Sequence, residues 1–377
     1  MNPYLTGRVS AGAIRHNLSL LRGCVGPRVK ICCVVKADAY GHGLDLLWPL
    51  LAEQAEMLAV ATPDEAVRLR GYGYRGPLLA FLTPCADGQR TGHGEMLSEA
   101  IRHGVTLTVT THHELAILSR AAAGAGRTAA IHVKIDSGMH RGGCTADEAA
   151  GLLAAARATP RVVLQGVYTH FATADEADKR DAMEQLAIFR RALGAAGGAA
   201  GLLTHAANSA ALIDLPESHG DMVRPGIAVY GYQPSDQMRA RLPLRPALQV
   251  VAPLLRVKPV TDGSRCGYGF THTFARDGRI GLVPVGYADG YLRSLSNRAT
   301  VRVAGRDVPV CGRVSMDQII IDLTDAPAAH AGDEVEIVSA DPSAPHSVEN
   351  LARLAGTIPY EITCRLNTAR MQRVLVA

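Results

Sequence analysis

The segment VVKADAYGHG, residues 34–43, carries the most informative reactive group of the chain. An apolar run, Val29–Val35, interrupted only by Lys30, predicts a buried strand that ends at Lys36. Because an amine at a buried strand end is costly unless it is paired or its pKa falls, Lys36 is well placed to form an imine with a carbonyl compound. Tyr40 would bring a hydroxyl to the same edge. The alternative, a lysine that simply reaches solvent where the strand ends, stays open on this segment alone.

Other residues with chemically useful side chains also follow apolar runs. Each has an ordinary interpretation by itself, since a histidine is often part of a core, a serine often caps a helix and arginines often form surface ion pairs. Gathered at one place, they would supply a hydroxyl, an amide and glycine-adjacent backbone N–H groups for a phosphate. They are Arg141 in KIDSGMHRGG, His170 in GVYTHFATAD, Asn208 and Ser209 in HAANSAA, and Arg224 and Gly226 in MVRPGIAVYG.

Strand–helix alternation up to about residue 235 predicts how these residues are positioned. Eight apolar runs, most of them followed by a helix-like segment, favour a closed (β/α)8 barrel of the TIM type. A doubly wound open sheet is the alternative, although the glycine fingerprint of a dinucleotide site is absent after the first run. The runs are Val29–Val35, Met57–Ala61, Leu78–Leu82, Val105–Thr111, Ala130–Asp136, Val162–Phe171, Leu202–Ala206 and Met222–Tyr230.

In such a barrel the C-terminal ends of the strands form one rim, which is where active sites lie. Lys36 ends the first strand, and the other reactive residues follow the fifth to eighth strands. The loops after strands seven and eight are a recurrent phosphate site in this architecture. A lysine imine beside a phosphate site indicates pyridoxal 5'-phosphate (PLP) as the cofactor.

Two helix starts are predicted from capping signals. Thr62-Pro-Asp-Glu65 and Thr111-His-His-Glu114 each place a capping residue three positions before a glutamate. His112 and His113 then lie on a helix surface, and no companion cluster suggests a metal site.

The sequence pattern changes beyond about residue 240. Residues 242–246, LPLRP, resemble a linker, and the following runs are short, rich in Val and Ile, and separated by Gly, Asp and Pro. We therefore expect a barrel domain over residues 1–240 and a mainly β domain over residues 241–377. The predicted strand regions are Ala247–Val257, Arg279–Pro284, Ala299–Val303, Ser315–Leu323 and Glu334–Val338.

Composition excludes several classes of protein. Hydrophobic residues make up 47% of the 377 residues and charged residues 20%, with a net charge of +4, which is ordinary for a globular protein and gives no basic patch for nucleic acid. Neither a signal peptide nor the ~18 apolar residues of a membrane span is found. The eight cysteines, including Cys32, Cys33 and Cys85, form no CxxC pair, so we expect a reducing cytoplasm.

With these motifs in place, the chain resembles the alanine racemases, PLP enzymes built from a barrel and a β domain. The resemblance runs from about residue 7 to about residue 372. It is carried by VVKADAYGHG, KIDSGMHRGG, HAANSAA, VRPGIAVYG, GYADGY, CGRVSMDQ and TIPYEITCRL.

The resemblance implies a role for each matching residue. Lys36 would hold PLP and act as one base, and Tyr268 would be the second base, supplied by the other subunit of a homodimer with composite sites. Arg224 would face the pyridine nitrogen with His170 behind it, and Arg141 would steer the substrate carboxylate, braced by a carbamylated Lys134. The remaining positions are Tyr40, Asn208, Ser209, Gly226, Ile227 and Tyr360 around the phosphate; Tyr287, Met316 and Asp317 at the substrate mouth; and Asp175, Arg293, Arg313 and Ile358 along the entry corridor.

The implied chemistry is coherent. Racemisation removes an α-proton from one face and returns a proton to the other, which two opposed bases accomplish. A tyrosine with a pKa of ~10 needs a nearby cation such as Arg141 to act as a base. Arg224 stays charged and would leave the pyridine nitrogen unprotonated, which would restrain transamination. The expected reaction supplies D-alanine for peptidoglycan.

Two departures and three alternatives remain. His140 stands where the family commonly has a small residue, and His272 where an aromatic residue is frequent. A racemase with a preference for serine or a broader set of amino acids is the close alternative, but Tyr360 favours a small pocket. Amino-acid decarboxylases of similar build typically place a carboxylate at the pyridine nitrogen, unlike Arg224. PLP-homeostasis proteins resemble the barrel alone.

Overall fold

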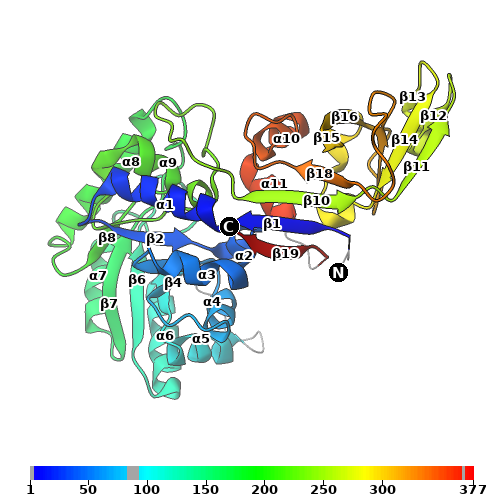
Figure 1. The fold of residues 1–377 in the computed structure, drawn as a ribbon. Helices are drawn as coiled ribbons and strands as arrows, with labels where there is room; N and C mark the ends of the chain where they lie inside the picture. The colour runs from blue at the N-terminus through cyan, green and yellow to red at the C-terminus, as the bar shows by residue number, and fades with distance from the viewer. Residues whose placement is uncertain (1–3, 83–92, 367–369) are drawn as a thin grey trace.

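The computed structural model describes residues 4–82, 93–366 and 370–377, so Cys85 lies outside the described residues. Two bodies are visible: a barrel of strands wrapped by helices, and an elongated body built mainly of strands (Figure 1). The predicted combination of a barrel and a mainly β region is therefore confirmed.

Eight parallel strands form the barrel in the order β8-β7-β6-β5-β4-β3-β2-β9. The two ends of this series also meet, because the backbone N–H of Asp221 donates to the carbonyl of Thr204 at 2.9 Å. A second bond joins the N–H of Arg224 to the carbonyl of Ala207 at 2.8 Å. Strands that follow one another around a closed ring exclude the doubly wound open sheet. Their bounds are β2 Lys30–Val34, β3 Met57–Val60, β4 Leu78–Ala80, β5 Thr106–Val109, β6 Ala129–Lys134, β7 Val162–Tyr168, β8 Leu203–His205 and β9 Met222–Val223.

The eighth strand is much shorter than predicted. β9 covers only Met222–Val223, and the rest of the apolar run forms the 3-10 helix η2, Ile227–Tyr230. Pro225 has no N–H to donate to a strand ladder, so the ladder stops before it. The predicted strand to residue 230 was wrong because an apolar run alone does not separate a strand from a buried helix. Arg224 consequently lies at the end of its strand, on the rim.

Helices follow most of the strands and cover the outside of the barrel (Figure 1). Thr111 and Glu114 form the full predicted capping box, while at Thr62 the hydroxyl accepts from the N–H of Glu65. Residues 112–113 are exposed at the start of their helix, as expected. The helices of this body are α1 Ala11–Val25, α2 Lys36–Tyr40, α3 Leu44–Ala52, α4 Pro63–Gly71, α5 His93–Arg102, α6 His112–Ala125, α7 Ala149–Ala158, α8 Arg180–Ala195 and α9 Ser209–Asp214. None of the helices in the described ranges has the length and apolar character needed to cross a membrane.

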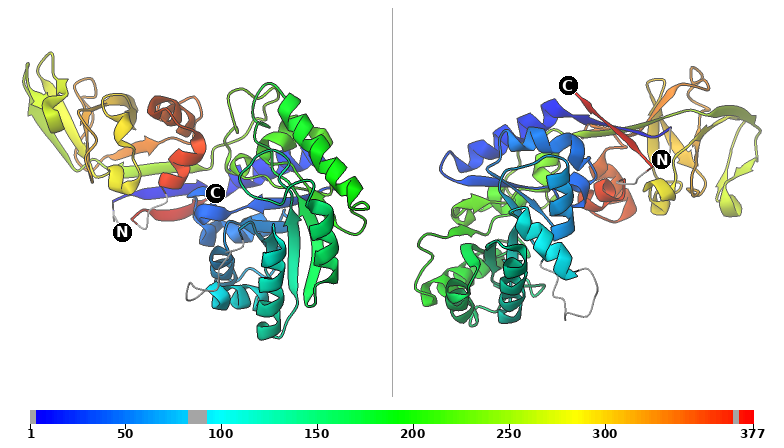
Figure 2. Two further views of the ribbon diagram at one scale, coloured as in Figure 1. Left: turned by 180° about the vertical axis from the view of Figure 1, so that it is seen from behind. Right: turned by 90° about the horizontal axis from the view of Figure 1, so that it is seen from below.

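The second body contains a nine-stranded sheet in the order β11-β14-β17-β16-β15-β18-β10-β1-β19. A separate hairpin, β12–β13, occupies the end of this body that is farthest from the barrel in every view (Figures 1 and 2). The elements are β10 Leu248–Pro253, β11 Arg256–Val260, β12 Arg265–Cys266, η3 Tyr268–Phe270, β13 His272–Thr273, β14 Gly278–Val283, η4 Tyr287–Asp289, β15 Thr300–Val303, β16 Arg306–Cys311, β17 Ile319–Asp322, β18 Glu334–Val338, α10 Val348–Ala355, α11 Pro359–Arg365 and β19 Gln372–Val376.

The first strand of the chain, β1 (Thr6–Ser10), belongs to the sheet of the second body. It pairs antiparallel with β10 and parallel with β19, and the three strands lie side by side (Figure 1). Its residues alternate between half-buried and buried, yet five residues are too few to predict a strand from periodicity. The helix α1 then carries the chain directly into the barrel. The predicted division of the chain at residue 240 stays a prediction. The strand β1 departs from it, because β1 precedes residue 240 in the sequence but pairs within the sheet of the second body.

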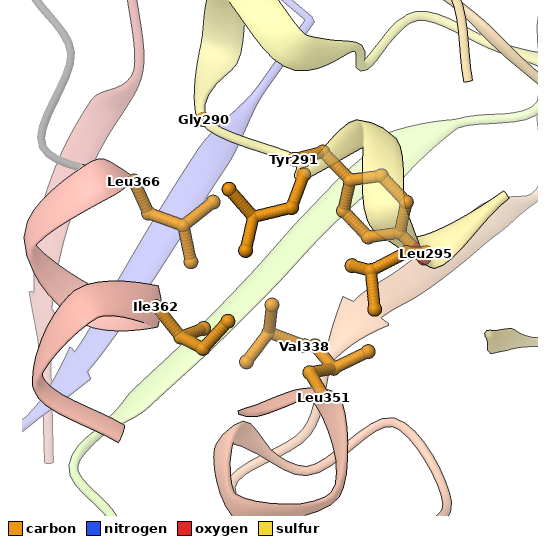
Figure 3. A pocket seen from close by; sticks show the side chains of 8 residues that line it. Gly290, Tyr291, Leu295, Val338, Leu351, Ile362 and Leu366 are labelled. Atoms are coloured by element: carbon orange, nitrogen blue, oxygen red, sulfur yellow. The ribbon is translucent and has the colours of Figure 1, made fainter. Parts of the chain in front are cut away.

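A small cavity of about 10 Å³ lies in the second body, lined by apolar side chains (Figure 3). A space of this size is at the lower limit for a single water molecule, which would also need polar partners. It is therefore too small for an amino acid, and none of the predicted site residues lines it. Its lining is Gly290, Tyr291, Leu292, Leu295, Val338, Leu351, Ile362 and Leu366.

Candidate active site

Lys36 begins an unusual turn at the end of β2. The four residues after it, Ala37 to Tyr40, have φ values of 51°, 55°, 55° and 53°, so they form one turn of left-handed helix without any glycine. The left-handed conformation costs a non-glycine residue roughly 1–2 kcal/mol. The sequence does not reveal this handedness, because none of these four residues is a glycine. The turn directs Lys36 and Tyr40 to the rim and must be stabilised by its surroundings.

Polar contacts on two sides hold this turn. The carboxylate of Glu65 accepts from the N–H of Ala37 at 2.9 Å. On the other side, Arg373 from β19 donates through Nε to the carbonyl of Gly41 at 3.0 Å. Arg373 also forms an ion pair with Asp38, Nη1 to Oδ2, at 3.2 Å. Sequence reasoning did not identify these bracing residues, because their partners are distant in the chain.

Lys36 itself is half-buried. Burial first, and then the nearby positive charge of Arg141, lower the pKa of the Lys36 amine. A lower pKa increases the neutral fraction near neutral pH, and only the neutral amine is a nucleophile or a base. The predicted reactive lysine therefore has a suitable environment.

The predicted phosphate-binding residues meet beside this turn. The hydroxyl of Ser209 accepts from the backbone N–H of Gly226 at 2.8 Å, which ties the start of α9 to the end of β9. A Cβ at Gly226 would clash with the hydroxyl of Tyr40, so a larger residue there would force this buried ring to move. The Tyr40 ring packs between those of Tyr230 and Tyr360, with centroid distances of 5.1 Å and 6.0 Å. Asn208, and not Ser209, caps α9.

Several contacts hold the side chain of Arg224 on the rim. It is buried, and its Nη2 donates to the carbonyls of Thr169 at 2.8 Å and Ala206 at 3.0 Å. The same nitrogen lies 3.4 Å from Nδ1 of His170, and the guanidinium stacks over Tyr168. Burial lowers the pKa of Arg224 to about 10, which still leaves it charged at neutral pH.

Two histidines that the sequence analysis did not single out continue this network. Nη1 of Arg224 lies 2.8 Å from Nδ1 of His205. Because an arginine can only donate, the ring proton of a neutral His205 must be on Nε2, which points to Nδ1 of His132 at 2.9 Å. Burial and the Arg224 charge hold the pKa of His205 well below its usual value, so it stays neutral. His205 begins the motif HAANSAA, whereas no motif of the sequence marks its partner His132.

Lys134 and Arg141 lie on the neighbouring part of the rim. Lys134 ends β6 and is half-buried, and burial followed by the charges of Arg141 and Arg224 lowers its pKa to about 8. Arg141 is exposed. The preceding His140 is also exposed, with a left-handed φ of 54°, and its N–H donates to the Asp136 carboxylate at 3.1 Å.

The residues expected from a partner subunit do not join this cluster within one chain. Tyr268 lies in η3, on the hairpin at the end of the second body away from the barrel (Figure 1). It is 69% exposed, and Tyr287, Met316 and Ile358 are 44%, 53% and 56% exposed. Asp317 is exposed and forms an ion pair with Arg370 at 2.8 Å. The corridor positions Arg293 and Arg313 are exposed, and Asp175 is half-buried.

Comparisons with known proteins find the same family along nearly the whole chain. The family model "Alanine racemase, N-terminal domain" matches residues 9–234, and "Alanine racemase, C-terminal domain" matches residues 247–375. An alanine racemase of Syntrophobacter fumaroxidans is 41% identical over 367 residues, covering 97% of this chain and 96% of the relative.

Solved structures give the same result. The alanine racemase from the D-cycloserine-producing Streptomyces lavendulae has a TM-score of 0.91 and 37% identity, covering 100% of this chain and 98% of that one. The biosynthetic alanine racemase from Pseudomonas aeruginosa has a TM-score of 0.85 and 34% identity, with full coverage of both chains.

Proposed function

Because this chain belongs to the alanine racemase family, we propose that it interconverts L-alanine and D-alanine with PLP as its cofactor and Lys36 and Tyr268 as its two bases. The proposal includes a homodimer in which each site is completed by Tyr268 of the partner subunit. It also includes a cytoplasmic role in supplying D-alanine for peptidoglycan, as expected for the family.

The rim residues fit PLP. Bound there, PLP would withdraw electrons from the α-carbon of the substrate and so make the α-proton removable. Lys36 would hold the aldehyde end. The hydroxyl of Ser209 already accepts from Gly226, so its own proton is directed elsewhere and can donate to a phosphate oxygen. Tyr40 would add a second hydroxyl, with Asn208, Ile227 and Tyr360 around them.

Arg224 would face the pyridine nitrogen. Its guanidinium donates to two backbone carbonyls and contacts His170 and His205, so it has little freedom to move. An arginine cannot hand a proton to that nitrogen, so the ring would stay neutral and a weaker electron sink. This favours reprotonation at the α-carbon over transamination. It also disfavours a decarboxylase, which would need a carboxylate at this place.

The two bases would act from opposite faces of the substrate. Lys36, with its lowered pKa, can take or return a proton on one face. Tyr268 would act on the other, where the exposed Arg141 would favour its phenolate and orient the substrate carboxylate. Lys134 would brace Arg141 as a carbamate, since an amine with a pKa of about 8 is partly neutral at physiological pH.

One observation carries this proposal: Tyr268 lies on the β12–β13 hairpin, at the end of the second body farthest from the barrel, whereas the turn α2 that begins with Lys36 lies where the barrel meets that body (Figure 1). Tyr268 is exposed at the tip of the β12–β13 hairpin, while Lys36 is on the barrel rim. A single chain therefore cannot supply both bases to one substrate. A second copy that presents its hairpin to this rim would complete the site and cover the exposed residues Tyr287, Met316 and Ile358.

Chiral chromatography tests the reaction. Purified protein with PLP and L-alanine should form D-alanine until the two enantiomers are equal, and Lys36→Ala should abolish this. Lys30→Ala, which removes an exposed lysine of the same strand, is the matched control and should keep full activity. If D-alanine still forms with Lys36→Ala, the proposed role of Lys36 is wrong.

Substrate preference is tested in the same assay. Tyr360 packs against Tyr40 and narrows the site, so L-serine should react far more slowly than L-alanine. Equal rates for the two amino acids would support the broader racemase and contradict the proposed specificity.

A further inference from the structure

Three side chains of the second body form a cluster that the proposed reaction does not use. His272 comes from β13, Cys311 ends β16 and Asp322 ends β17. One ligand atom from each, an imidazole nitrogen, the thiol sulfur and a carboxylate oxygen, lie within 4.8 Å of one another. Cys311 is buried, and the other two are half-buried. The cluster therefore joins the hairpin that carries Tyr268 to the main sheet.

Each of these three side chains also has contacts outside the cluster, and those contacts restrict its orientation. The carboxylate of Asp322 accepts from the N–H of Thr324 at 2.8 Å through Oδ1. The His272 ring packs edge-on against Phe274, with a centroid distance of 4.7 Å. The Cys311 sulfur lies 3.6 Å from a backbone carbonyl oxygen, a weak contact for a thiol. These contacts restrict the ring and the carboxylate, and the three ligand atoms remain within 4.8 Å of one another.

The types of ligand atom select a class of metal ion. A thiolate and an imidazole favour zinc over magnesium or calcium, which prefer oxygen ligands alone. Thiolate, neutral imidazole and carboxylate together carry two negative charges, which balance one divalent cation. In the metal-free protein, burial first and then Asp322 and Cys266 raise the pKa of the Cys311 thiol, so metal binding would release its proton to solvent.

From this geometry we infer that His272, Cys311 and Asp322 form a zinc-binding site, with a water molecule as the fourth ligand. Tetrahedral zinc has bonds of about 2.3 Å to sulfur and about 2.0–2.2 Å to nitrogen and oxygen. The three ligand atoms lie within 4.8 Å of one another, so small rotations of the side chains could bring them to these bond lengths around one ion.

Metal binding can be measured on the PLP-loaded enzyme without an activity assay. The protein is treated with a chelator, desalted, titrated with Zn²⁺ by calorimetry and analysed for retained metal by mass spectrometry. We expect one zinc per chain, and a more than 100-fold weaker affinity in Cys311→Ser and in His272→Phe, since losing even an outer-shell partner costs about 10–100-fold. Cys24→Ser and His103→Gln are matched controls from the barrel body and should bind as the parent protein does.

X-ray absorption on the unsubstituted enzyme keeps the test independent of variant folding. The zinc should show one sulfur ligand at about 2.3 Å with nitrogen or oxygen ligands completing the shell. No retained zinc, a zinc shell without sulfur, or retention that is unchanged in both ligand variants would each overturn the site. The last outcome would mean binding elsewhere, for example at PLP.

Discussion

Arg373, in β19, is joined to Asp38, two residues after Lys36, by an ion pair of 3.2 Å. The two side chains are only 14% and 24% exposed, so solvent screens them less than a surface pair. The contact spans 335 positions of the chain and ties the sheet of the second body to the turn that presents Lys36. The geometry of the turn that begins with Lys36 thus depends on a residue outside the barrel.

Replacing Arg373 should disturb the lysine without touching the substrate. Arg373→Ala removes the ion pair and the bond to Gly41, so the left-handed turn, which costs roughly 1–2 kcal/mol per residue, can relax. We expect kcat to fall about 10-fold or more, because small misplacements of a reacting group are costly. PLP should also dissociate faster, which its absorbance reports. Arg276→Ala, which breaks an exposed ion pair with Asp325, is the control, and equal kinetics in both variants would contradict the bracing role.

Mixing two inactive variants should restore activity if the sites are composite. Lys36→Ala and Tyr268→Phe homodimers each lack one base in both sites. A random 1:1 mixture contains half heterodimers, each with one intact site, so about a quarter of the parent activity should return. The measurement is racemase activity before and after subunit exchange, with sedimentation to follow the dimer. Two variants that never complement each other would refute the shared site.

Changing Arg224 should alter the fate of the substrate more than its binding. Arg224→Glu places a carboxylate where PLP enzymes of other types have one, so the pyridine nitrogen would become protonated and transamination would increase. We expect racemisation to fall by at least about 100-fold, because the buried network around His205 also loses its donor. Pyruvate formation per racemisation event, measured with lactate dehydrogenase, should rise. An unchanged ratio of pyruvate formation to racemisation would contradict the proposed role of Arg224.

Carbamylation of Lys134 should depend on pH in a defined direction. Only the neutral amine reacts with carbon dioxide, and its neutral fraction grows as the pH rises through the pKa of about 8. After incubation with ¹³C-bicarbonate, a carbamate NMR signal should therefore be stronger at pH 9 than at pH 7. Lys134→Ala should lose it, whereas Lys258→Ala, which removes an exposed lysine, should keep it. A signal that survives in Lys134→Ala belongs to another group.

The sequence could predict the barrel because most of its strands lie in short apolar runs that alternate with helical segments, and some of these strands, such as β3 and β5, are buried along their whole length. Lys36, Ser209 and Arg224 were predicted at the rim for the same reason, since strand ends share one edge. The left-handed turn could not be predicted, because Ala37 to Tyr40 include no glycine and their conformation depends on distant partners.

The contact between His132 and His205 could not be predicted for a different reason. His205 and His132 are 73 positions apart and meet only because β6, β7 and β8 are neighbours in the closed barrel. Single-sequence patterns report burial and local turns, and they carry no information on which buried polar groups face each other across a barrel.

The place of β1 has a consequence for how the molecule is assembled. Because residues 6–10 pair with both 248–253 and 372–376, the sheet of the second body closes only after segments from both ends of the chain have come together. Forming such long-range pairs is slow, since the entropy of closing the loop is lost before the contacts form. A C-terminal fragment that begins after residue 240 would lack β1, the strand that separates β10 from β19 in the sheet. Each body therefore needs a segment from the other part of the chain to complete its fold.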